Sequence, residues 1–206
     1  MTLTRGWDTL QDGNNGSNEK VNYTKFDAGE MTEIRCLTNE PVLRWSHYLP
    51  MAKRSVTCIG KGCPACDARE QAKSAGIQPK ISTSKKFAMI IYNFKTKQIE
   101  ILEQGKAFIE QLYGFHTEIG DITKYNIKVK RIGEKTNTTY TLIPCAESEL
   151  DYEGLGIDMD NLPDLAKQFK APTKEQMLAL MDGKSPQEVF GNTNDNKDED
   201  DEEFEI

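Results

Sequence analysis

The 206-residue sequence has no long apolar run, and its longest apolar stretch covers roughly residues 87–91. A membrane-spanning helix needs about 20 apolar residues, so we expect no such helix. Residues 1–20 lack the apolar stretch of a signal peptide, and we therefore expect a protein that is not secreted. Hydrophobic residues make up 37% of the chain, which is low for a wholly globular protein but sufficient for one core.

Residues typical of catalytic centres are also scarce or scattered. The sequence has two histidines, and neither lies in a recognisable acid–base or nucleophile motif. Acidic residues are spread through the body of the chain, and no glycine-rich phosphate-binding loop is present. We therefore assign no catalytic residues and expect a protein that is not an enzyme.

The formal net charge of −7 hides an uneven distribution of charge along the chain. Residues 1–145 hold 21 Lys/Arg against 15 Asp/Glu, a net charge of +6. Residues 146–194 hold 4 against 10, and residues 195–206 hold 1 against 8. A basic body suits a polyanionic ligand, and an acidic end suits a basic partner or the body itself. The alternative is a solvated acidic end that has no binding role.

The hydrophobic pattern predicts a mainly β protein with helices, of the α+β class, in which short strands form a small barrel. Residues 1–20 are rich in Gly, Asn, Ser and Asp and predict a flexible arm. Residues 21–145 predict the β domain, with an inserted cysteine-bearing subdomain at about residues 45–76. Residues 146–191 predict an acidic helical region, and residues 192–206 predict a disordered acidic tail.

Within these regions the alternation of apolar and polar residues predicts individual elements. Strands are expected at residues 86–94, 98–102, 122–132 and 138–143, and helices at residues 67–75 and 105–113. Two capping boxes, Thr173 with Gln176 and Ser185 with Glu188, predict the starts of two helices near the C-terminal end.

Five cysteines in a chain that is not expected to be secreted indicate free thiols or metal ligands, not disulfides. Cys58, Cys63 and Cys66 lie within nine residues, and the last two form a Cys-Pro-Ala-Cys turn. This segment has few apolar side chains, so we expect it to need a staple other than a hydrophobic core. Three clustered thiolates predict one structural Zn²⁺, which needs a fourth ligand.

The fourth ligand is open on spacing alone. His47 is the nearest upstream imidazole, Cys36 and Cys145 are alternatives, and His116 is a more distant one. Two other interpretations of the cysteines are free thiols and a redox Cys-x-x-Cys pair. A redox pair leaves Cys58 unexplained and is expected in a βαβ context that this sequence lacks.

Basic and aromatic residues are interleaved along the basic body. Single strands of nucleic acid are held by stacking on aromatic rings and by pairing of phosphates with cations, so this pattern indicates a surface for single-stranded DNA. The alternative for each cluster is an ordinary solvated face of an antiparallel strand. The candidate DNA-contacting residues are Arg44, Trp45, Tyr48, Lys53, Arg54, Lys85, Lys86, Tyr92, Phe94, Lys95, Tyr125, Lys128, Lys130 and Arg131.

Taken together, the basic strand-rich body, the His…Cys…Cys-Pro-x-Cys insertion and the acidic tail resemble phage single-stranded DNA-binding proteins, nearest to the zinc-containing helix-destabilising type of T-even phages. The resemblance covers about residues 25–145 and the tail, and segments 120–133 and 139–144 look like the barrel hairpin of such proteins. In that type the zinc ligands come in the order His, Cys, Cys, Cys. The residues that match this order are His47, Cys58, Cys63 and Cys66.

The resemblance implies an OB-fold with a zinc subdomain. It also implies a protein that coats and protects single-stranded DNA during phage replication, recombination and repair in the cytoplasm of an infected bacterium. Self-association on DNA is a further implication. The family's tail recruits replication and recombination proteins, such as a polymerase, a helicase or its loader. The matching tail residues here are Asp200, Asp201, Glu202, Glu203, Phe204, Glu205 and Ile206.

Two other classes of protein compete with this interpretation. A zinc-ribbon adaptor or transcription regulator would read duplex DNA through a helix in the major groove. The helix expected next to the cysteines, at residues 67–75, has mixed charge, which counts against it. A thiol oxidoreductase or a metal-dependent nuclease is the other class, and a nuclease would need clustered carboxylates in the folded body.

Overall fold

The computed structural model describes residues 21–133 and 137–191. The described part divides into two compact units, residues 43–86 with 169–191, called here the metal unit, and residues 21–42 with 87–168, called here the sheet unit. The expected arm at residues 1–20 and the expected tail at residues 192–206 lie outside the described residues.

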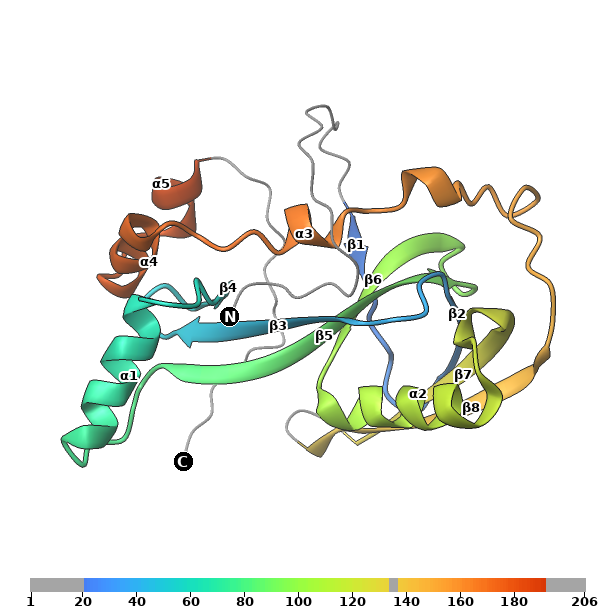
Figure 1. Cartoon of the computed structure of the whole chain (residues 1–206), viewed down its shortest axis with the longest axis horizontal. Coiled ribbons are helices and arrows are strands. Elements are labelled where there is room, and N and C mark those ends of the chain that lie inside the picture. Colours follow the sequence, from blue (N-terminus) through green and yellow to red (C-terminus); the bar gives the residue numbers. More distant parts are fainter. Residues whose placement is uncertain (1–20, 134–136, 192–206) are drawn as a thin grey trace. The chain divides into compact units, whose positions relative to one another are not determined.

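The sheet unit contains a strand path in the order β1-β6-β5-β2-β7-β8. These strands are β1 (Asn22–Tyr23), β2 (Met31–Cys36), β5 (Ser82–Asn93), β6 (Gln98–Gln104), β7 (Tyr125–Ile132) and β8 (Thr139–Glu147), of which β5 belongs to this unit from residue 87 onward. The pair β1–β6 is parallel, and the other neighbours in the path are antiparallel (Figure 1).

Strand β7 shows how the sequence specifies this sheet. Ile127 and Val129 are buried, whereas Lys128 and Lys130, which alternate with them along the strand, are exposed. This is the alternation that the sequence predicts for a strand with one face on a core. The predicted strands at residues 86–94, 98–102, 122–132 and 138–143 are confirmed with shifted ends. The third of them starts later than predicted because Ile122–Lys124 forms a short 3₁₀ helix, η1.

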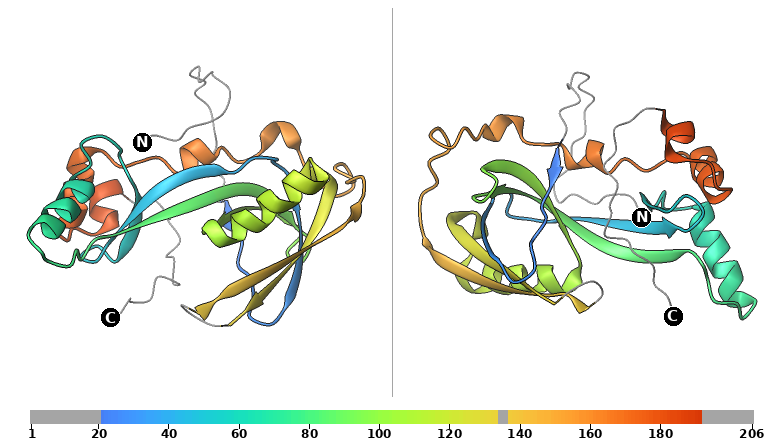
Figure 2. Two further views of the ribbon diagram at one scale, coloured as in Figure 1. Left: turned by 60° about the horizontal axis from the view of Figure 1, so that its bottom comes forward. Right: turned by 180° about the vertical axis from the view of Figure 1, so that it is seen from behind.

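Helix α2 (Lys106–Ile119) connects β6 to η1 and packs against β8 and η1 (Figures 1 and 2). Its buried side chains are Phe108, Ile109 and Leu112, which recur at helical spacing. They join one hydrophobic cluster with buried side chains of β2, β5, β6, β7 and β8. The expected helix at residues 105–113 is therefore confirmed and runs six residues further.

The α+β class is confirmed, whereas the expected barrel is not closed by the strand pairs of the described residues. Strands β1 and β8 are the two ends of the hydrogen-bonded path. An isolated bridge between Ala28 and Arg131 brings the segment after β1 to β7, but it lies outside the named strands. The sheet is therefore open within the described part of the chain.

The segment that follows β8 is less helical than expected. Between residues 148 and 168 the structure has turns, the 3₁₀ helix η3 (Met159–Asn161) and the single-turn helix α3 (Leu165–Gln168). The start of this segment is fixed to the sheet because Arg35 Nη2 donates to the backbone oxygen of Ser148 at 2.6 Å. The expectation of a helical region over residues 146–191 is corrected accordingly, since acidic residues and glycines leave residues 148–158 without an apolar helical face.

The metal unit combines strands with helices from two distant parts of the sequence. It contains β3 (Val42–Leu49, from residue 43), β4 (Arg54–Thr57), α1 (Pro64–Ser74), the start of β5, α4 (Lys174–Met181) and α5 (Pro186–Phe190). Strand β3 pairs with both β4 and β5, and α4 packs against α1 and α5 (Figure 2). Both predicted capping boxes are confirmed, at Thr173 for α4 and at Ser185 for α5.

The metal unit has a hydrophobic core of its own, which corrects the expectation that residues 51–67 lack one. Met177 and Leu180 of α4 are both 0% exposed and pack in one cluster with Leu49, Val56 and Ala65. The apolar partners of residues 51–67 lie more than 100 residues further along the chain, so the local sequence pattern does not reveal them. The expected acidic helical region thus divides between the units, with residues 146–168 in the sheet unit and residues 169–191 in the metal unit.

Among the described residues, no helix is both long and apolar enough to span a membrane.

Candidate metal centre

Four side chains of the metal unit meet at one point, with all ligand atoms within 4.8 Å of one another. We call this group the His-Cys₃ cluster; its members are His47, Cys58, Cys63 and Cys66. The Sγ atoms of Cys58 and Cys66 are 3.7 Å apart. His47 Nε2 lies 3.6 Å from Cys63 Sγ and 3.4 Å from Cys66 Sγ.

Local backbone geometry brings Cys58 and Cys63 back toward each other. Gly60 and Gly62 have φ of 91° and 76°, in the left-handed region that glycine adopts without strain. The Cys63 N–H donates to Gly60 O at 3.2 Å, and the Gly60 N–H donates to Cys58 Sγ at 3.4 Å. The two glycines of the Cys58-Ile-Gly-Lys-Gly-Cys63 segment therefore make the turn that the metal geometry requires.

The start of α1 holds the other pair of thiols. Cys63 is the N-cap residue, Pro64 occupies the first turn, and Cys66 lies three residues after the cap. A helix N-terminus presents free backbone N–H groups and a positive dipole end, which favour a thiolate. Burial raises the pKa of the Cys63 thiol, but hydrogen bonds from the backbone N–H groups of Cys66, Ile59 and Ala65 outweigh it and hold that pKa below its ordinary value.

The pKa of the Cys66 thiol is raised, in contrast to that of Cys63. Burial raises its pKa, and the neighbouring Cys58 and Cys63 raise it further, to about 12. Three thiolates this close repel one another unless a cation lies between them. A bound divalent cation removes this repulsion and favours the deprotonated form of each thiol.

The imidazole of His47 is held so that one nitrogen faces the sulfurs. The ring is 0% exposed, and burial lowers the pKa of His47, so the neutral form is favoured near pH 7. Nδ1 lies 3.0 Å from Thr83 Oγ1 on β5. The Ser82 backbone is a second hydrogen-bond acceptor for this ring. In the tautomer that carries its proton on Nδ1, the Nε2 lone pair points at Cys63 and Cys66, which is the arrangement of a metal-bound histidine.

The cluster fits a tetrahedral metal ion in size as well as in donor type. Zn–S bonds of about 2.3 Å and Zn–N bonds of about 2.0–2.1 Å imply S···S distances of about 3.8 Å and S···N distances of about 3.6 Å in a tetrahedron. The observed 3.7, 3.6 and 3.4 Å agree with these values to within about 0.2 Å. Three of the six ligand pairs therefore have the spacing of a tetrahedral zinc site, and all four ligand atoms lie within 4.8 Å of one another, so the His-Cys₃ cluster could hold one metal ion such as zinc.

The structure distinguishes His47 from the other possible fourth ligands. Cys36 lies in the hydrophobic cluster of the sheet unit, where burial raises its pKa to about 12. Cys145 lies on β8, and His116 lies near the end of α2. Of the described residues, only the four of the cluster come together in a metal-binding group.

Two of the candidate DNA-contacting arginines of the metal unit lie against aromatic rings. The guanidinium of Arg44 is 4.6 Å from the ring centroid of Phe169 and also donates to Thr57 Oγ1 at 3.2 Å. The guanidinium of Arg54 is 5.7 Å from the ring centroid of Phe190. Both rings belong to the C-terminal part of this unit, so these arginines help to hold that part in place.

The remaining candidates of the metal unit differ in exposure. Trp45 is 36% exposed, and the Lys85 ammonium lies 5.9 Å from its ring centroid. Lys53 is exposed at the turn between β3 and β4, whereas Tyr48 and Lys86 are half-buried.

In the sheet unit, the expectation that Tyr92 stacks on bases is corrected. Tyr92 is 3% exposed, and its ring packs edge-to-face on Phe94 at a centroid distance of 5.1 Å. Both faces of β5 are buried at this point, because residues 88–93 are buried without interruption. Phe94 is half-buried beside it.

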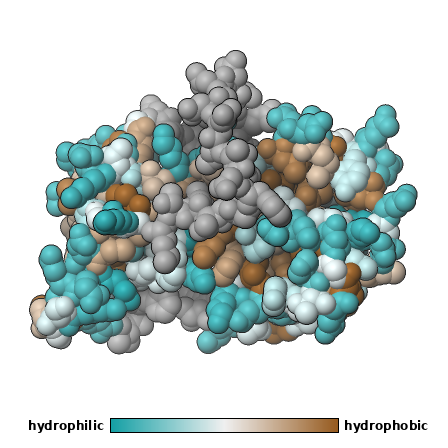
Figure 3. Space-filling view, in the orientation of Figure 1, coloured by the Kyte–Doolittle hydropathy of each residue, from teal (hydrophilic) through white to brown (hydrophobic). Residues whose placement is uncertain are grey.

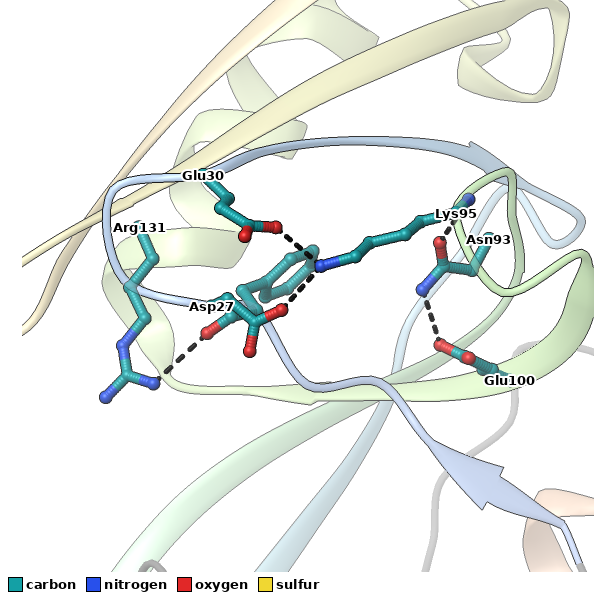
Figure 4. Close-up of polar contacts among 7 residues, drawn as sticks. Asp27, Glu30, Asn93, Lys95, Glu100 and Arg131 are labelled. Carbon is teal, nitrogen blue, oxygen red and sulfur yellow. Dashed lines mark hydrogen bonds and ion pairs between the residues drawn. The ribbon is translucent and has the colours of Figure 1, made fainter.

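Lys95 and Arg131 both contact the segment between β1 and β2 (Figure 4). Lys95 Nζ lies 2.6 Å from Asp27 Oδ2 and 2.5 Å from Glu30 Oε2. These two carboxylates hold the pKa of Lys95 above its ordinary value. Arg131 donates through Nη1 to the backbone oxygen of Phe26 at 3.1 Å. A phosphate would have to compete with these acceptors for either cation.

The β7 candidates are presented at the surface. Lys128 and Lys130 are exposed on one face of the strand. Tyr125 is half-buried, and its hydroxyl lies 3.5 Å from Glu147 Oε2. Of the candidate residues in the sheet unit, the two lysines are therefore the ones whose positions suit contact with a phosphate backbone.

Sequence inspection did not identify three sets of residues that support the candidate centre. Thr83 orients the His47 ring, Met177 and Leu180 pack in the same apolar cluster as Cys63, and Phe190 lies over Arg54. The capping box at Thr173 predicted that α4 exists, but it contains no information about the surface on which α4 packs.

Comparison of the chain with protein-family models, with curated proteins and with solved structures gives no match.

Proposed function

We propose that this protein binds single-stranded DNA and that one structural zinc ion fastens its metal unit. The observation that carries the proposal is the meeting of four ligands in the chain order His, Cys, Cys, Cys, which is the order of the phage proteins that the sequence resembles. Four protein ligands complete a tetrahedral set and leave no open position for substrate. Zinc in such a site has a structural role.

Exposed cations and one exposed indole support the nucleic-acid part of the proposal. Lys128 and Lys130 follow one face of β7, and Trp45 with Lys85 forms a second basic and aromatic surface in the metal unit. Cations that pair with phosphates and rings that stack on bases are the two means by which proteins hold single strands of any sequence.

The strand order supports an OB-fold-like architecture for the sheet unit. The five strands β6-β5-β2-β7-β8 are neighbours in this order and enclose one hydrophobic cluster together with α2. An OB-fold is a five-stranded, partly open barrel that binds oligonucleotides on one face and its adjoining loops. The open strand path of the sheet unit is compatible with such a partly open barrel.

The proposed role is to coat and protect single-stranded DNA during phage replication, recombination and repair. Residues 195–206 carry a charge of −7 and end in Phe204, Glu205 and Ile206. By the same resemblance, this tail recruits replication and recombination proteins; it lies outside the described residues. Deletion of residues 195–206 should abolish partner capture by immobilised protein while zinc content stays unchanged.

The surface of α1 counts against a zinc-ribbon protein that reads duplex DNA. This helix is the one next to the cysteines, and its exposed side chains include Asp67, Glu70 and Lys73. In the view of Figure 3, the surface at the place of α1 is mainly hydrophilic. A recognition helix in the major groove would bring the two carboxylates against phosphates, which is unfavourable.

The proposal is tested by measuring the affinity of the full-length protein for single-stranded and duplex oligonucleotides of the same sequence at two salt concentrations. Binding should favour the single strand and should weaken steeply with salt, with a slope of about −0.7 per phosphate contacted. Purified protein should contain about one zinc per chain. Equal affinity for both DNA forms, or protein free of zinc when purified without chelator, would contradict the proposal.

A further inference from the structure

Trp45 stands out among the aromatic residues of the metal unit because its large ring is partly left in solvent. It is 36% exposed, whereas Phe169 is 3% exposed and Tyr48 and Phe190 are half-buried. The Lys85 ammonium lies 5.9 Å from the Trp45 ring centroid, within the range of a cation–π interaction. An accessible ring and a cation are therefore adjacent on β3 and β5.

A backbone hydrogen bond links Trp45 directly to a residue of the His-Cys₃ cluster. The Cys58 N–H donates to the Trp45 backbone oxygen at 2.8 Å. His47 lies two residues further along β3, so its side chain leaves the strand on the same face as that of Trp45. One metal ligand is thus hydrogen-bonded to the Trp45 backbone, and a second lies two residues further along the same strand.

We propose that Trp45 and Lys85 form a stacking site for one unpaired base and its phosphate, and that the bound metal sets the position of this site. The inference rests on the proposed function and names the part of the metal unit that touches DNA. A base stacks on the indole face, and Lys85 pairs with the phosphate of the same or the next nucleotide. The site takes any base, because stacking uses the ring and not the hydrogen-bonding edge.

The metal dependence follows from the short segments around the site. Residues 58–63 turn through two glycines and are held to β3 by the Cys58–Trp45 hydrogen bond and by the His-Cys₃ cluster. When the metal leaves, the thiols and the imidazole lose their common ligand, and the part of β3 that carries Trp45 loses one of its supports, although its pairing with β4 and β5 remains. The ring then no longer presents one orientation to a base.

Fluorescence isolates this site because the sequence contains two tryptophans, Trp7 and Trp45. In a Trp7→Phe variant of the full chain, all tryptophan emission comes from Trp45. Titration with a single-stranded oligothymidylate should quench this emission, since a stacked base quenches indole fluorescence. Removal of zinc with a chelator should change the emission before DNA is added and should abolish most of the quenching.

Affinity measurements with labelled oligothymidylate test the energetic part of the inference. Trp45→Ala should weaken binding about 5- to 150-fold, and Trp45→Phe should recover part of this loss. Lys85→Ala should lower the salt slope by about 0.7. Lys73→Ala, which removes an exposed lysine from α1 in the same unit, is the matched control and should leave affinity and quenching unchanged.

The outcomes separate this inference from the proposed function. Zinc content close to one per chain in each variant shows that the cluster is still present. If the protein binds oligothymidylate but Trp45 emission does not change and Trp45→Ala binds within twofold of the parent, the stacking site is wrong while the proposed function stands. If labelled oligothymidylate does not bind at all, both are wrong. Quenching that persists unchanged without zinc would overturn the metal dependence alone.

Discussion

The packing of α4 in the metal unit predicts that a buried leucine, distant from the cysteines in the sequence, controls how firmly the metal is retained. Leu180 is 0% exposed and lies in one apolar cluster with Cys63, Val56 and Leu49. Replacement by Ala removes three carbons, which corresponds to about 2.4 kcal/mol at about 0.8 kcal/mol per buried carbon. The cavity that remains raises the cost to about 3–4 kcal/mol.

A loss of about 3–4 kcal/mol is large for a unit of this size. Whole domains are stable by about 5–15 kcal/mol, and each 1.4 kcal/mol changes an equilibrium about tenfold. Leu180→Ala should therefore raise the open fraction of the metal unit by a factor of about 100 or more. Because the metal binds the folded arrangement of ligands, apparent zinc affinity should fall with it.

The same helix supplies a matched control. Leu178 lies two residues earlier on α4 and is 42% exposed, so Leu178→Ala should cost about 1 kcal/mol or less. Both variants make the same chemical change in the same helix and differ in burial. Zinc release to a chromophoric chelator, followed across a urea series, compares the two directly.

The expected result is zinc release from Leu180→Ala at a much lower urea concentration than from Leu178→Ala, which should resemble the parent. Coincident release curves for the two variants would show that α4 does not stabilise the metal unit. That result would refute the reasoning even if the protein binds zinc, because it concerns packing and not ligand identity.

Three further predictions concern the cluster and the proposed DNA-binding surface. Cys63→Ser should reduce zinc content from about one per chain to near zero by elemental analysis, whereas Cys145→Ser, outside the cluster, should keep it. Thr83→Val should weaken zinc binding about 10- to 100-fold in competition with a chelator, and Thr83→Ser should restore it; equal affinity of the Val variant and the parent would show that Thr83 does not orient the ligand histidine. Lys128→Ala with Lys130→Ala should lower the slope of log affinity against log salt for single-stranded DNA by about 0.7 for each phosphate that the variant no longer binds, and an unchanged slope would remove β7 from the binding surface.

Most of the local structure could be predicted from the sequence. The alternation around Ile127 and Val129 predicted β7, and the capping boxes at Thr173 and Ser185 predicted α4 and α5. These signals depend on neighbouring residues, since a strand repeats every two residues and an N-cap acts over three. The three clustered cysteines were likewise visible, because ligands on one tight turn are brought together by the turn itself.

The tertiary structure alone decided which residue completes the cluster and what covers it. His47 and Cys36 both precede the cysteines in the sequence, but β3 carries the first toward the thiols and β2 carries the second into the core of the sheet unit. In the sequence, Tyr92 and Trp45 are equally suitable for stacking. In the structure, both faces of β5 are buried around Tyr92, whereas Trp45 is partly exposed.

The packing of α4 within the metal unit is the clearest example of a feature that the sequence alone does not determine. The sequence determined that an amphipathic helix begins after Thr173, but it did not determine that Met177 and Leu180 pack beside Cys63. Contacts between residues more than 100 positions apart depend on how two apolar surfaces fit once both have formed. Hydrophobic burial is non-directional and leaves no local mark of its partner, so only the folded chain reveals the pairing.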